Sequence, residues 1–348
     1  MSHVSGAVAR GVLRRGWAAT VDDYAIACHW ALGGSLLVVG DVAGGLFGFE
    51  GTSGAVRWKH ADSHGQGLLA MAAHPDGDLF ATAGQDGHVR YWRASDGTME
   101  RSVEVGRGWV EHLAWSPDGR YLAVVMSRRV HVFDREGNQA WQSEEHPSTV
   151  SAIAWAGSEQ LATACYGRVA FLGASSGSLL EKLEWKGSLV SMALSPDGEI
   201  VACGSQDNSV HFWRRSTGED SMMSGYFGKP SALAFDASGK LLATGGAEIV
   251  TVWSFEGDGP EGTRPGSLKL HVLPITTLEF SHRGRRLASG GRDGGVVVWT
   301  VAGDGEGAAV GAALLGDRVS GLAWRPDDRA LAGLDAKGGV LVWRVGKG

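Results

Sequence analysis

The sequence predicts an all-β fold built from repeated units of short strands. The first indication is residues 64–92, where three apolar segments are separated by a Pro-Asp-Gly turn and an Asp-Gly turn. Tight turns of this composition join short antiparallel strands. The second is that similar stretches recur through the 348 residues, and the third is that 54 glycines and 14 tryptophans occur without long helical periodicity. These observations favour a repeat architecture over several unrelated domains.

The repeat spacing comes from two independent anchors. The first anchor is the last residue of the third strand of each unit, found at intervals of 39 to 46 residues: Phe49, Trp92, Phe133, Leu172, Trp213, Trp253, Trp299 and Trp343. The second is an apolar residue in the first strand, found at intervals of 39 to 45 residues: Cys28, Met71, Leu113, Ile153, Met192, Leu233, Leu278 and Leu322. The agreement between the two anchors divides the chain into eight units, numbered 1 to 8 in chain order.

A fourth strand is expected between successive units. Residues 55–60, 98–105, 178–185 and 267–272 are strand-like segments in this position, and nearby Asp-Gly, Ser-Gly and Thr-Gly pairs supply the turns. Each unit is therefore expected to contain four antiparallel strands.

Several segments resemble the WD-repeat β-propeller family. They are LAWSPDG at 113–119, MALSPDG at 192–198, LLATGG at 241–246, LASGGRDGGVVVW at 287–299 and the stretch 64–92. The resemblance covers essentially the whole chain and implies one propeller domain of four-stranded antiparallel blades over residues 1–348. The chain departs from the family in one respect, since no unit ends in Trp-Asp. The aspartate position holds other residues: Arg93, Arg214, Ser254, Thr300 and Arg344.

The resemblance also implies how the ring closes. Eight triplets of strands are expected, but only seven fourth strands follow them, and residues 12–19 are available to supply the eighth. An N-terminal strand commonly completes the C-terminal blade in this family, which leaves no unfinished edge. We therefore expect eight blades, with seven as the alternative if a degenerate unit such as 150–172 is not a true blade. Residues 254–266 are expected to form an inserted loop.

Blades of this family can carry a hydrogen-bonded tetrad of a loop His, a strand Ser or Thr, a turn Asp and a strand Trp. Two units match it in full, with His64, Thr82, Asp86 and Trp92 in unit 2 and His271, Ser289, Asp293 and Trp299 in unit 7. Unit 4 keeps His146 and Thr163, whereas unit 5 has Lys186 and Cys203 at the corresponding positions. Because the set recurs, we interpret it as a structural network and not as a catalytic relay.

Composition and charge narrow the possible partners and location. The formal charge of −6 gives no general attraction to nucleic acid or to an anionic membrane. Three cysteines, none in a CxxC pair, favour a reducing compartment, so a cytoplasmic location is expected. Residues 1–20 contain three arginines and no acid, which faintly resembles an organellar transit peptide, but ring closure gives this segment a structural role.

Two enzyme-like motifs do not have the context that their chemistry requires. Residues 173–177 match G-x-S-x-G, but a strand and not a helix is expected to follow them. Residues 257–262 match G-x-G-x-x-G, but Pro260 and Pro265 block the helix that would bind a phosphate. We therefore expect no catalytic residues, no cofactor and no metal site, while a metal or small ligand in a central channel remains open.

The best candidates for function lie on the loops that carry the tetrad histidine and the turn aspartate. In this fold such loops open on one rim, and binding sites commonly lie on loops above a rigid scaffold. Units 3 to 6 carry Tyr, Trp and Arg there, which are enriched at interface hot spots. The predicted partner contacts are Arg107, Trp109, Arg128, Tyr166, Arg168, Lys186, Tyr226 and Phe227. The alternative for Trp109 and Phe227 is packing between blades, with the arginines solvated.

These observations predict a non-catalytic protein–protein interaction scaffold that binds another protein or a peptide at the rim. An enzyme with a site in the central channel and a phosphopeptide reader are the alternatives. The sequence leaves the partner's identity and the oligomeric state open.

Overall fold

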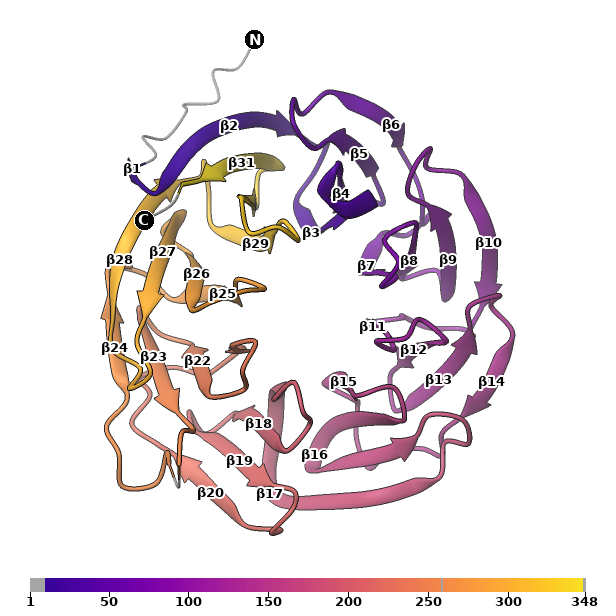
Figure 1. Cartoon of the computed structure of the whole chain (residues 1–348). Coiled ribbons are helices and arrows are strands. Elements are labelled where there is room, and N and C mark those ends of the chain that lie inside the picture. The colour runs from indigo at the N-terminus through magenta and orange to yellow at the C-terminus, as the bar shows by residue number, and fades with distance from the viewer. Residues whose placement is uncertain (1–9, 258, 347–348) are drawn as a thin grey trace.

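The computed structural model describes residues 10–257 and 259–346. Its strands form a ring of antiparallel sheets around a central axis (Figure 1). The innermost strands contact one another in order around the ring, and β29 (Val319–Trp324) contacts β3 (Ala25–Ala31), which closes it. The expected all-β propeller is confirmed. The first nine residues, which include part of the segment compared with a transit peptide, lie outside the described residues.

Units 1 to 3 are regular four-stranded sheets in which the chain runs from the inside of the ring to the outside. Within each unit, successive strands pair antiparallel. Unit 1 also contains the short 3-10 helix η1 (Leu32–Gly34). The remaining strands are β4 (Leu36–Asp41), β5 (Leu46–Glu50), β6 (Val56–His60), β7 (Leu68–Ala73), β8 (Leu79–Gly84), β9 (His88–Arg93), β10 (Met99–Glu104), β11 (His112–Trp115), β12 (Tyr121–Met126), β13 (Arg129–Asp134) and β14 (Gln139–Gln142).

Units 4 and 5 are joined in one six-stranded sheet. Two long strands cause this, β16 (Gln160–Gly173) and β17 (Leu179–Leu194). The first part of β17 pairs with β16, and its second part pairs with the next strand, β18, so one strand serves both units. The other strands are β15 (Ala152–Ala156), β18 (Ile200–Ser205), β19 (Val210–Arg214) and β20 (Asp220–Met223).

The ring therefore has seven blades when blades are counted as hydrogen-bonded sheets. All eight repeat units are present, but the prediction of eight separate blades is wrong, and the seven-blade alternative matches. The reason lies in the degenerate unit 4, where Tyr166 pairs with Ser188 and extends the ladder through residues 185–187. Other units have a loop at that place, which separates one sheet from the next.

Units 6 to 8 complete the ring as regular sheets with additions from the N-terminus. Their strands are β21 (Ala232–Phe235), β22 (Leu241–Gly245), β23 (Ile249–Ser254), β24 (Gly266–Lys269), β25 (Ile275–Phe280), β26 (Arg286–Gly291), β27 (Gly295–Val301), β28 (Gly307–Leu314), β30 (Ala330–Asp335) and β31 (Gly339–Val345), with β29. The short β1 (Arg10–Gly11) pairs with β28 as a fifth strand of unit 7.

The expected closing strand is confirmed. β2 (Leu13–Thr20) pairs antiparallel with β31 from Leu13 opposite Val345 to Thr20 opposite Gly339, and so becomes the fourth strand of unit 8. The N-terminal and C-terminal strands thus lie side by side in Figure 1. This pairing covers an edge that would otherwise expose unpaired backbone groups.

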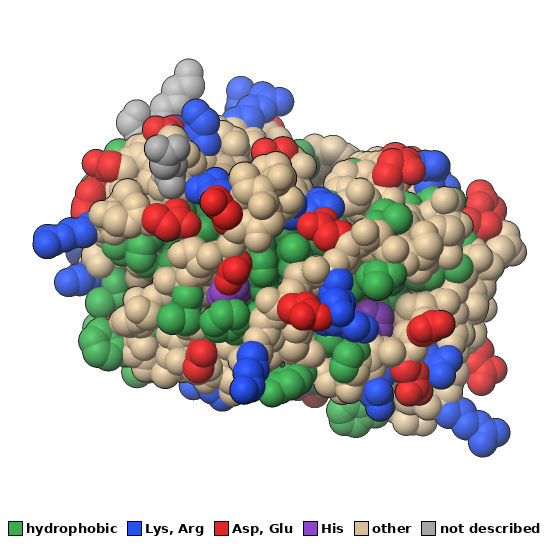
Figure 2. All heavy atoms as spheres, turned by 90° about the horizontal axis from the view of Figure 1, so that it is seen from below, with side chains coloured by type: hydrophobic (Ala, Val, Ile, Leu, Met, Phe, Trp, Pro, Cys, Tyr) green, Lys and Arg blue, Asp and Glu red, His purple; other side chains and the backbone are tan. Residues whose placement is uncertain are grey.

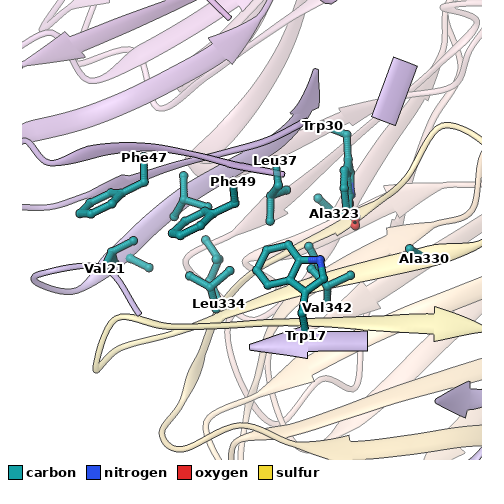
Figure 3. Packing of buried hydrophobic residues seen from close by; sticks show 14 residues of the cluster. Trp17, Val21, Trp30, Leu37, Phe47, Phe49, Ala323, Ala330, Leu334 and Val342 are labelled. Atoms are coloured by element: carbon teal, nitrogen blue, oxygen red, sulfur yellow. Dashed lines mark hydrogen bonds between the residues drawn. The ribbon is translucent and has the colours of Figure 1, made fainter. Parts of the chain in front are cut away.

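The hydrophobic core is divided among clusters that lie between successive units. The cluster between units 8 and 1 includes Trp17 on β2, Phe49 on β5 and Val342 on β31 (Figure 3). Within it, Trp30 Nε1 donates to the carbonyl of Ala323 (3.0 Å), which ties the two units across the point of closure. The middle strands are buried along their length, as in β4 and β8, because neighbouring units cover both of their faces.

The loop between β23 and β24 corresponds to the insertion expected at 254–266. It folds back on unit 5, where Arg214 donates to the carbonyl of Gly259. Phe255 packs edge-on against Phe212, with 5.2 Å between the ring centroids. A strand follows it, so the G-x-G-x-x-G motif does not open a helix.

No helix among the described residues is long and apolar enough to cross a membrane.

Candidate functional site

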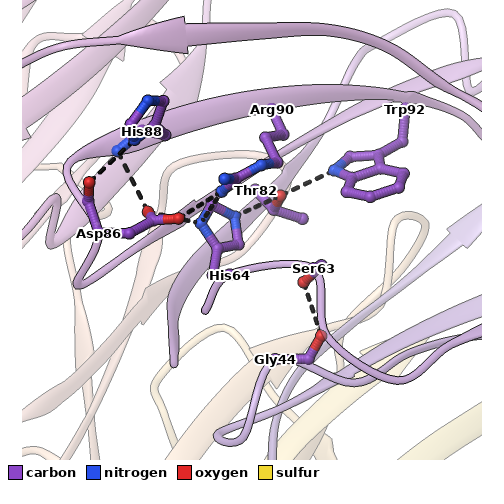
Figure 4. A network of polar contacts seen from close by, with 8 residues as sticks. All are labelled: Gly44, Ser63, His64, Thr82, Asp86, His88, Arg90 and Trp92. Atoms are coloured by element: carbon purple, nitrogen blue, oxygen red, sulfur yellow. Dashed lines mark hydrogen bonds and ion pairs between the residues drawn. The ribbon is translucent and has the colours of Figure 1, made fainter. Parts of the chain in front are cut away.

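The complete tetrad of unit 2 joins the rim to the blade core (Figure 4). His64 Nδ1 lies 2.9 Å from Asp86 Oδ1, and His64 Nε2 lies 2.8 Å from Thr82 Oγ1. Thr82 Oγ1 in turn accepts from Trp92 Nε1 (2.8 Å). Burial lowers the pKa of His64 below its usual value, although Asp86 opposes this effect, so the neutral ring suits these hydrogen bonds.

Asp86 connects this tetrad to the turn that carries it. Its carboxylate accepts from the backbone N–H of His88 (3.2 Å) and pairs with Arg90 (2.7 Å). Burial alone would raise the pKa of Asp86, but the hydrogen bonds from His64 and Arg90 outweigh it and lower the pKa. The ionised aspartate therefore holds both the loop and the turn in place.

The tetrad of unit 7 has the same connections and also fixes a loop. Ser289 Oγ accepts from Trp299 Nε1 (2.8 Å) and lies 2.8 Å from His271 Nε2, while His271 Nδ1 lies 3.2 Å from Asp293. Asp293 additionally accepts from the backbone N–H of Val272 (2.8 Å). The residue next to the tetrad histidine is thereby held at the rim.

Unit 6 builds a tetrad-like network with a tyrosine. The Tyr226 hydroxyl accepts from Trp253 Nε1 (2.7 Å) and lies 2.9 Å from Thr244 Oγ1. It therefore contacts the strand threonine as the tetrad histidine does in units 2 and 7. Burial raises the pKa of Tyr226 to about 12. The polar group of Tyr226 is thus used inside the blade, while contact of its half-buried ring with a partner stays a prediction.

Unit 4 retains half of the tetrad and has a cavity beside it. His146 Nε2 lies 2.9 Å from Thr163 Oγ1, but Leu172 stands where units 2 and 7 have tryptophan. The cavity has a volume of ≈ 340 Å³ and is lined by Leu172, Ala170 and the half-buried Arg168. At two of these positions, Leu172 and Ala170 are smaller than Trp92 and Arg90, which occupy the corresponding positions of unit 2.

Unit 5 replaces the tetrad with an aromatic cluster. Trp185 stacks on His211 with 3.7 Å between the ring centroids. His211 packs edge-on against Trp213 with 4.4 Å between the centroids. Cys203 is fully buried, while Lys186 is exposed. Burial lowers the pKa of His211. Ring packing thus takes the place of the tetrad in this unit, and His211 Nε2 also lies 3.0 Å from Asp220.

The predicted partner contacts lie at one end of the ring, which we call the tetrad rim. It comprises the segments that enter each unit, the turns between second and third strands, and the adjoining strand ends. The entering segments are 21–24, 61–67, 105–111, 143–151, 185–187, 224–231, 270–274 and 315–318. The turns are 42–45, 85–87, 127–128, 166–167, 206–209, 246–248, 292–294 and 336–338. Six predicted contacts are exposed there: Arg107, Trp109, Arg128, Tyr166, Lys186 and Phe227.

Two basic residues at the turn of unit 3 are partly neutralised. Arg128 and Arg129 both approach Glu145, at 3.8 and 3.3 Å, and Arg128 also donates to the carbonyl of His146 (2.8 Å). A phosphate group would have to displace Glu145 to reach both arginines. This geometry does not favour the phosphopeptide alternative.

Four exposed apolar residues of the tetrad rim are not among the predicted contacts. They belong to units 7 and 8: Leu270, Val272, Leu273 and Leu314. Three of them flank the tetrad histidine in the segment LHVL at 270–273, where the unit 2 loop has Ser63 and Gly65. Apolar residues on either side of a loop histidine were the available signal.

The enzyme-like features do not form a site in the described residues. Ser175 of the G-x-S-x-G motif lies in a turn that leads into β17, so no helix follows it. Among residues 10–257 and 259–346, no three His, Cys, Asp or Glu side chains are grouped so that they could hold a metal ion.

Comparison with known proteins places the chain among propellers. The model of the WD domain, G-beta repeat, matches residues 59–93, 100–134, 177–214 and 262–300, which fall in units 2, 3, 5 and 7. The chain therefore carries four WD40 repeats, and the resemblance noted in the sequence is confirmed.

Curated relatives match at low identity over part of their length. Actin-interacting protein 1 of Caenorhabditis elegans is 25% identical over 248 residues, which are 68% of this chain and 40% of that protein. Serine-threonine kinase receptor-associated protein of Gallus gallus is 24% identical over 173 residues, or 49% of each chain. WD repeat-containing protein 90 of Xenopus tropicalis is 40% identical over 90 residues, which are 24% of this chain and 5% of that protein. The chain spans less than half the length of these relatives.

Solved structures support the fold. The computationally designed Ika8 protein superimposes with a TM-score of 0.81 at 21% identity, covering 95% of this chain and 100% of the designed one. A chain of the Mitotic Checkpoint Complex superimposes with a TM-score of 0.67 at 21% identity, covering 80% of this chain and 87% of that one.

Proposed function

Because the chain is a β-propeller that carries WD40 repeats, we propose that it is a non-catalytic scaffold that binds another protein or peptide through its tetrad rim. One observation carries the proposal. Among the described residues, seven of the twelve exposed large hydrophobic side chains lie on the tetrad rim. The other five lie on the outer strands: Val56, Met99, Leu179, Leu180 and Met222. Exposed apolar side chains that gather on one surface are typical of interaction sites.

The outer wall of the ring has a different character. Figure 2 views this wall over units 4 to 6, where charged side chains of both signs are interspersed with hydrophobic ones. Mixed charge of this kind is typical of solvated surface. The tetrad rim is therefore the better candidate for a partner site.

A capture experiment tests the proposal. The wild-type chain and the triple variant Trp109→Ala/Tyr166→Ala/Phe227→Ala are immobilised and exposed to a lysate of the native host, and retained proteins are identified by mass spectrometry. We expect the wild type to retain a defined partner that the rim variant retains much less. Val56→Ala/Met99→Ala is the matched control, since it removes exposed apolar side chains from outer strands.

Folding of each variant is checked by circular dichroism and thermal melting. A rim variant that remains folded and retains the same proteins as the wild type would contradict the use of this rim. A wild-type chain that retains no specific protein would contradict the scaffold function itself.

We also propose that the protein acts in a reducing compartment, the cytoplasm. Cys28, Cys165 and Cys203 are all unpaired, and the last two are buried. Buried thiols without a partner suit an environment in which disulfides do not form. Imaging of a fluorescent fusion in the native host tests this, and accumulation in an oxidising compartment would contradict it.

A further inference from the structure

We propose that the tetrad rim of units 6 to 8 binds an acidic segment of a partner protein that also carries large apolar side chains. This inference rests on the proposed scaffold function and specifies the chemistry of the partner. It begins with five exposed apolar residues, which we call the 6–8 patch: Phe227, Leu270, Val272, Leu273 and Leu314.

The 6–8 patch is strongly exposed for side chains of this type. Phe227 is 86% exposed and Val272 is 77% exposed, while Leu270, Leu273 and Leu314 are 52%, 47% and 55% exposed. They belong to three consecutive segments of the rim, which enter units 6, 7 and 8. If a partner covered these side chains, each Å² of apolar surface removed from water would contribute a favourable free energy of about 25 cal/mol.

Backbone hydrogen bonds hold these segments next to one another. The N–H of Ile275 donates to the carbonyl of Ala247 (2.9 Å), and the N–H of Arg292 donates to that of Pro274 (2.9 Å). The N–H of Leu315 donates to the carbonyl of Gly294 (2.9 Å). The segment before unit 6 joins at Gly246, where an added Cβ would lie 2.1 Å from the carbonyl oxygen of Lys229.

The charge around the 6–8 patch is positive although the whole chain is negative. Five basic residues are exposed on these segments: Lys229, Lys269, Arg292, Arg318 and Lys337. Glu248 is the one exposed acid on the same described segments. The overall formal charge of −6 makes this local excess a specific feature of the rim.

The other acids of units 6 to 8 at this rim are already engaged. Asp293 binds His271 and the N–H of Val272, and Asp335 is buried and accepts from backbone N–H groups. Asp317 pairs with Lys337 at 3.0 Å. Within the described residues, no acidic side chain forms an ion pair with Lys229, Lys269 or Arg292.

Exposed apolar side chains on segments that also carry basic residues, three of them without an ion pair among the described residues, are complementary to a segment that mixes acidic and large apolar residues. The charges would steer the encounter, and the apolar contacts would provide most of the affinity. A nucleic acid would match the charge, but four of the five patch residues are aliphatic and offer no ring for base stacking.

Selection from a random-peptide library displayed on phage tests the proposal. The library is selected in parallel on the wild-type chain and on Val272→Ser/Leu273→Ser, which changes exposed side chains only. We expect peptides selected on the wild type to be enriched in Asp and Glu together with Leu, Ile or Phe, relative to the starting library. Peptides without this enrichment, or none selected above background, would overturn the proposal.

The best selected peptide is then labelled and titrated by fluorescence anisotropy. We expect affinity to fall about tenfold or more in both Val272→Ser/Leu273→Ser and Lys229→Glu/Arg292→Glu, and to be unchanged in the control Val56→Ser/Met99→Ser. Equal binding by all variants would place the peptide elsewhere and refute the site. In the lysate experiment, a partner retained equally by the wild type and the patch variant would leave the scaffold function standing and remove this inference alone.

Discussion

At the scale of single residues, Thr82 is the centre of the unit 2 tetrad. Its hydroxyl is fully buried and is shared by His64 and Trp92. Valine has nearly the same shape but no hydroxyl, so it would leave two buried polar groups without a partner. An unsatisfied buried group costs about 1–3 kcal/mol.

Thr82→Val is therefore expected to lower the free energy of unfolding by about 2 kcal/mol, as measured by urea denaturation. Thr98→Val is the matched control, because Thr98 is exposed in a turn, and we expect little change from it. Equal stabilities of the two variants would show that the tetrad contributes nothing.

Glu279 is an unusual residue in a repeated position. The residue after the first-strand anchor is alanine in six units, histidine in unit 1 and glutamate in unit 7. Glu279 Oε2 is buried without a hydrogen-bond partner. Burial, reinforced by the nearby Asp328, raises the pKa of Glu279 to about 8, and the Cys28 thiol lies close enough for Glu279 to raise its pKa further.

A raised carboxyl pKa makes stability fall as pH rises. Between the ordinary glutamate pKa of about 4.3 and the folded value of about 8, the folded state holds a proton that the unfolded state has lost. The stabilisation contributed by the protonated Glu279 is complete below about pH 4.3. It is lost progressively as the pH rises to about 8. We expect Glu279→Gln to flatten this part of a melting-temperature profile between pH 5 and pH 9, unlike the exposed control Glu136→Gln. Parallel profiles of the wild type and Glu279→Gln through this window would contradict the assignment.

At the scale of elements, β2 is the strand on which closure depends. Trp17 on β2 is 8% exposed, packs against Phe49 at 5.7 Å, and donates to the carbonyl of Gly51 (3.0 Å). It thereby attaches the closing strand of unit 8 to the neighbouring unit 1. Its loss would leave a cavity at the junction of the two ends of the ring.

Trp17→Ala is expected to lower the free energy of unfolding by about 3–5 kcal/mol. Trp109→Ala provides the same substitution at a side chain that is 56% exposed, and its expected effect is within about 0.5 kcal/mol. Chemical denaturation of both variants compares them directly. A similar loss in both would mean that Trp109 also packs between blades, which is the alternative left open by the sequence.

The sequence was sufficient for most elements and insufficient for a few particular residues. Repeat spacing located the strands and the closing role of β2, because turn residues and apolar anchors are local signals. The merging of units 4 and 5 depends on the pairing of Tyr166 with Ser188, which is a contact between distant segments. Tyr226 reads as an interface residue by type, and only the positions of Trp253 and Thr244 show that its hydroxyl is used internally. Leu270 and Val272 read as strand residues because the expected strand covers 267–272, whereas β24 ends at Lys269 and leaves both exposed.

At the scale of the whole molecule, the core clusters form a closed series between successive units. No unit can unfold without exposing the apolar faces of both neighbours. We therefore expect one cooperative transition, in which tryptophan fluorescence and far-ultraviolet circular dichroism report the same midpoint in urea.

Removing residues 10–20 would delete β2 and open the series of core clusters between units 8 and 1. The truncated chain is expected to have a lower midpoint and a smaller dependence of unfolding free energy on urea, because less surface remains to be exposed on unfolding. Unchanged values would show that closure by β2 is dispensable.

The hydrogen bonds that join Ala247, Pro274 and Gly294 to the neighbouring segments also have a consequence for the thermodynamics of recognition. A surface fixed by its own backbone has little conformational entropy to lose when a ligand arrives. The cost of ordering then falls on the partner, about 1–2 kcal/mol for each residue whose backbone becomes fixed. Partners whose segment is already shaped for the rim would therefore bind more tightly than flexible ones with the same contacts, and the difference would be seen in the entropy of binding.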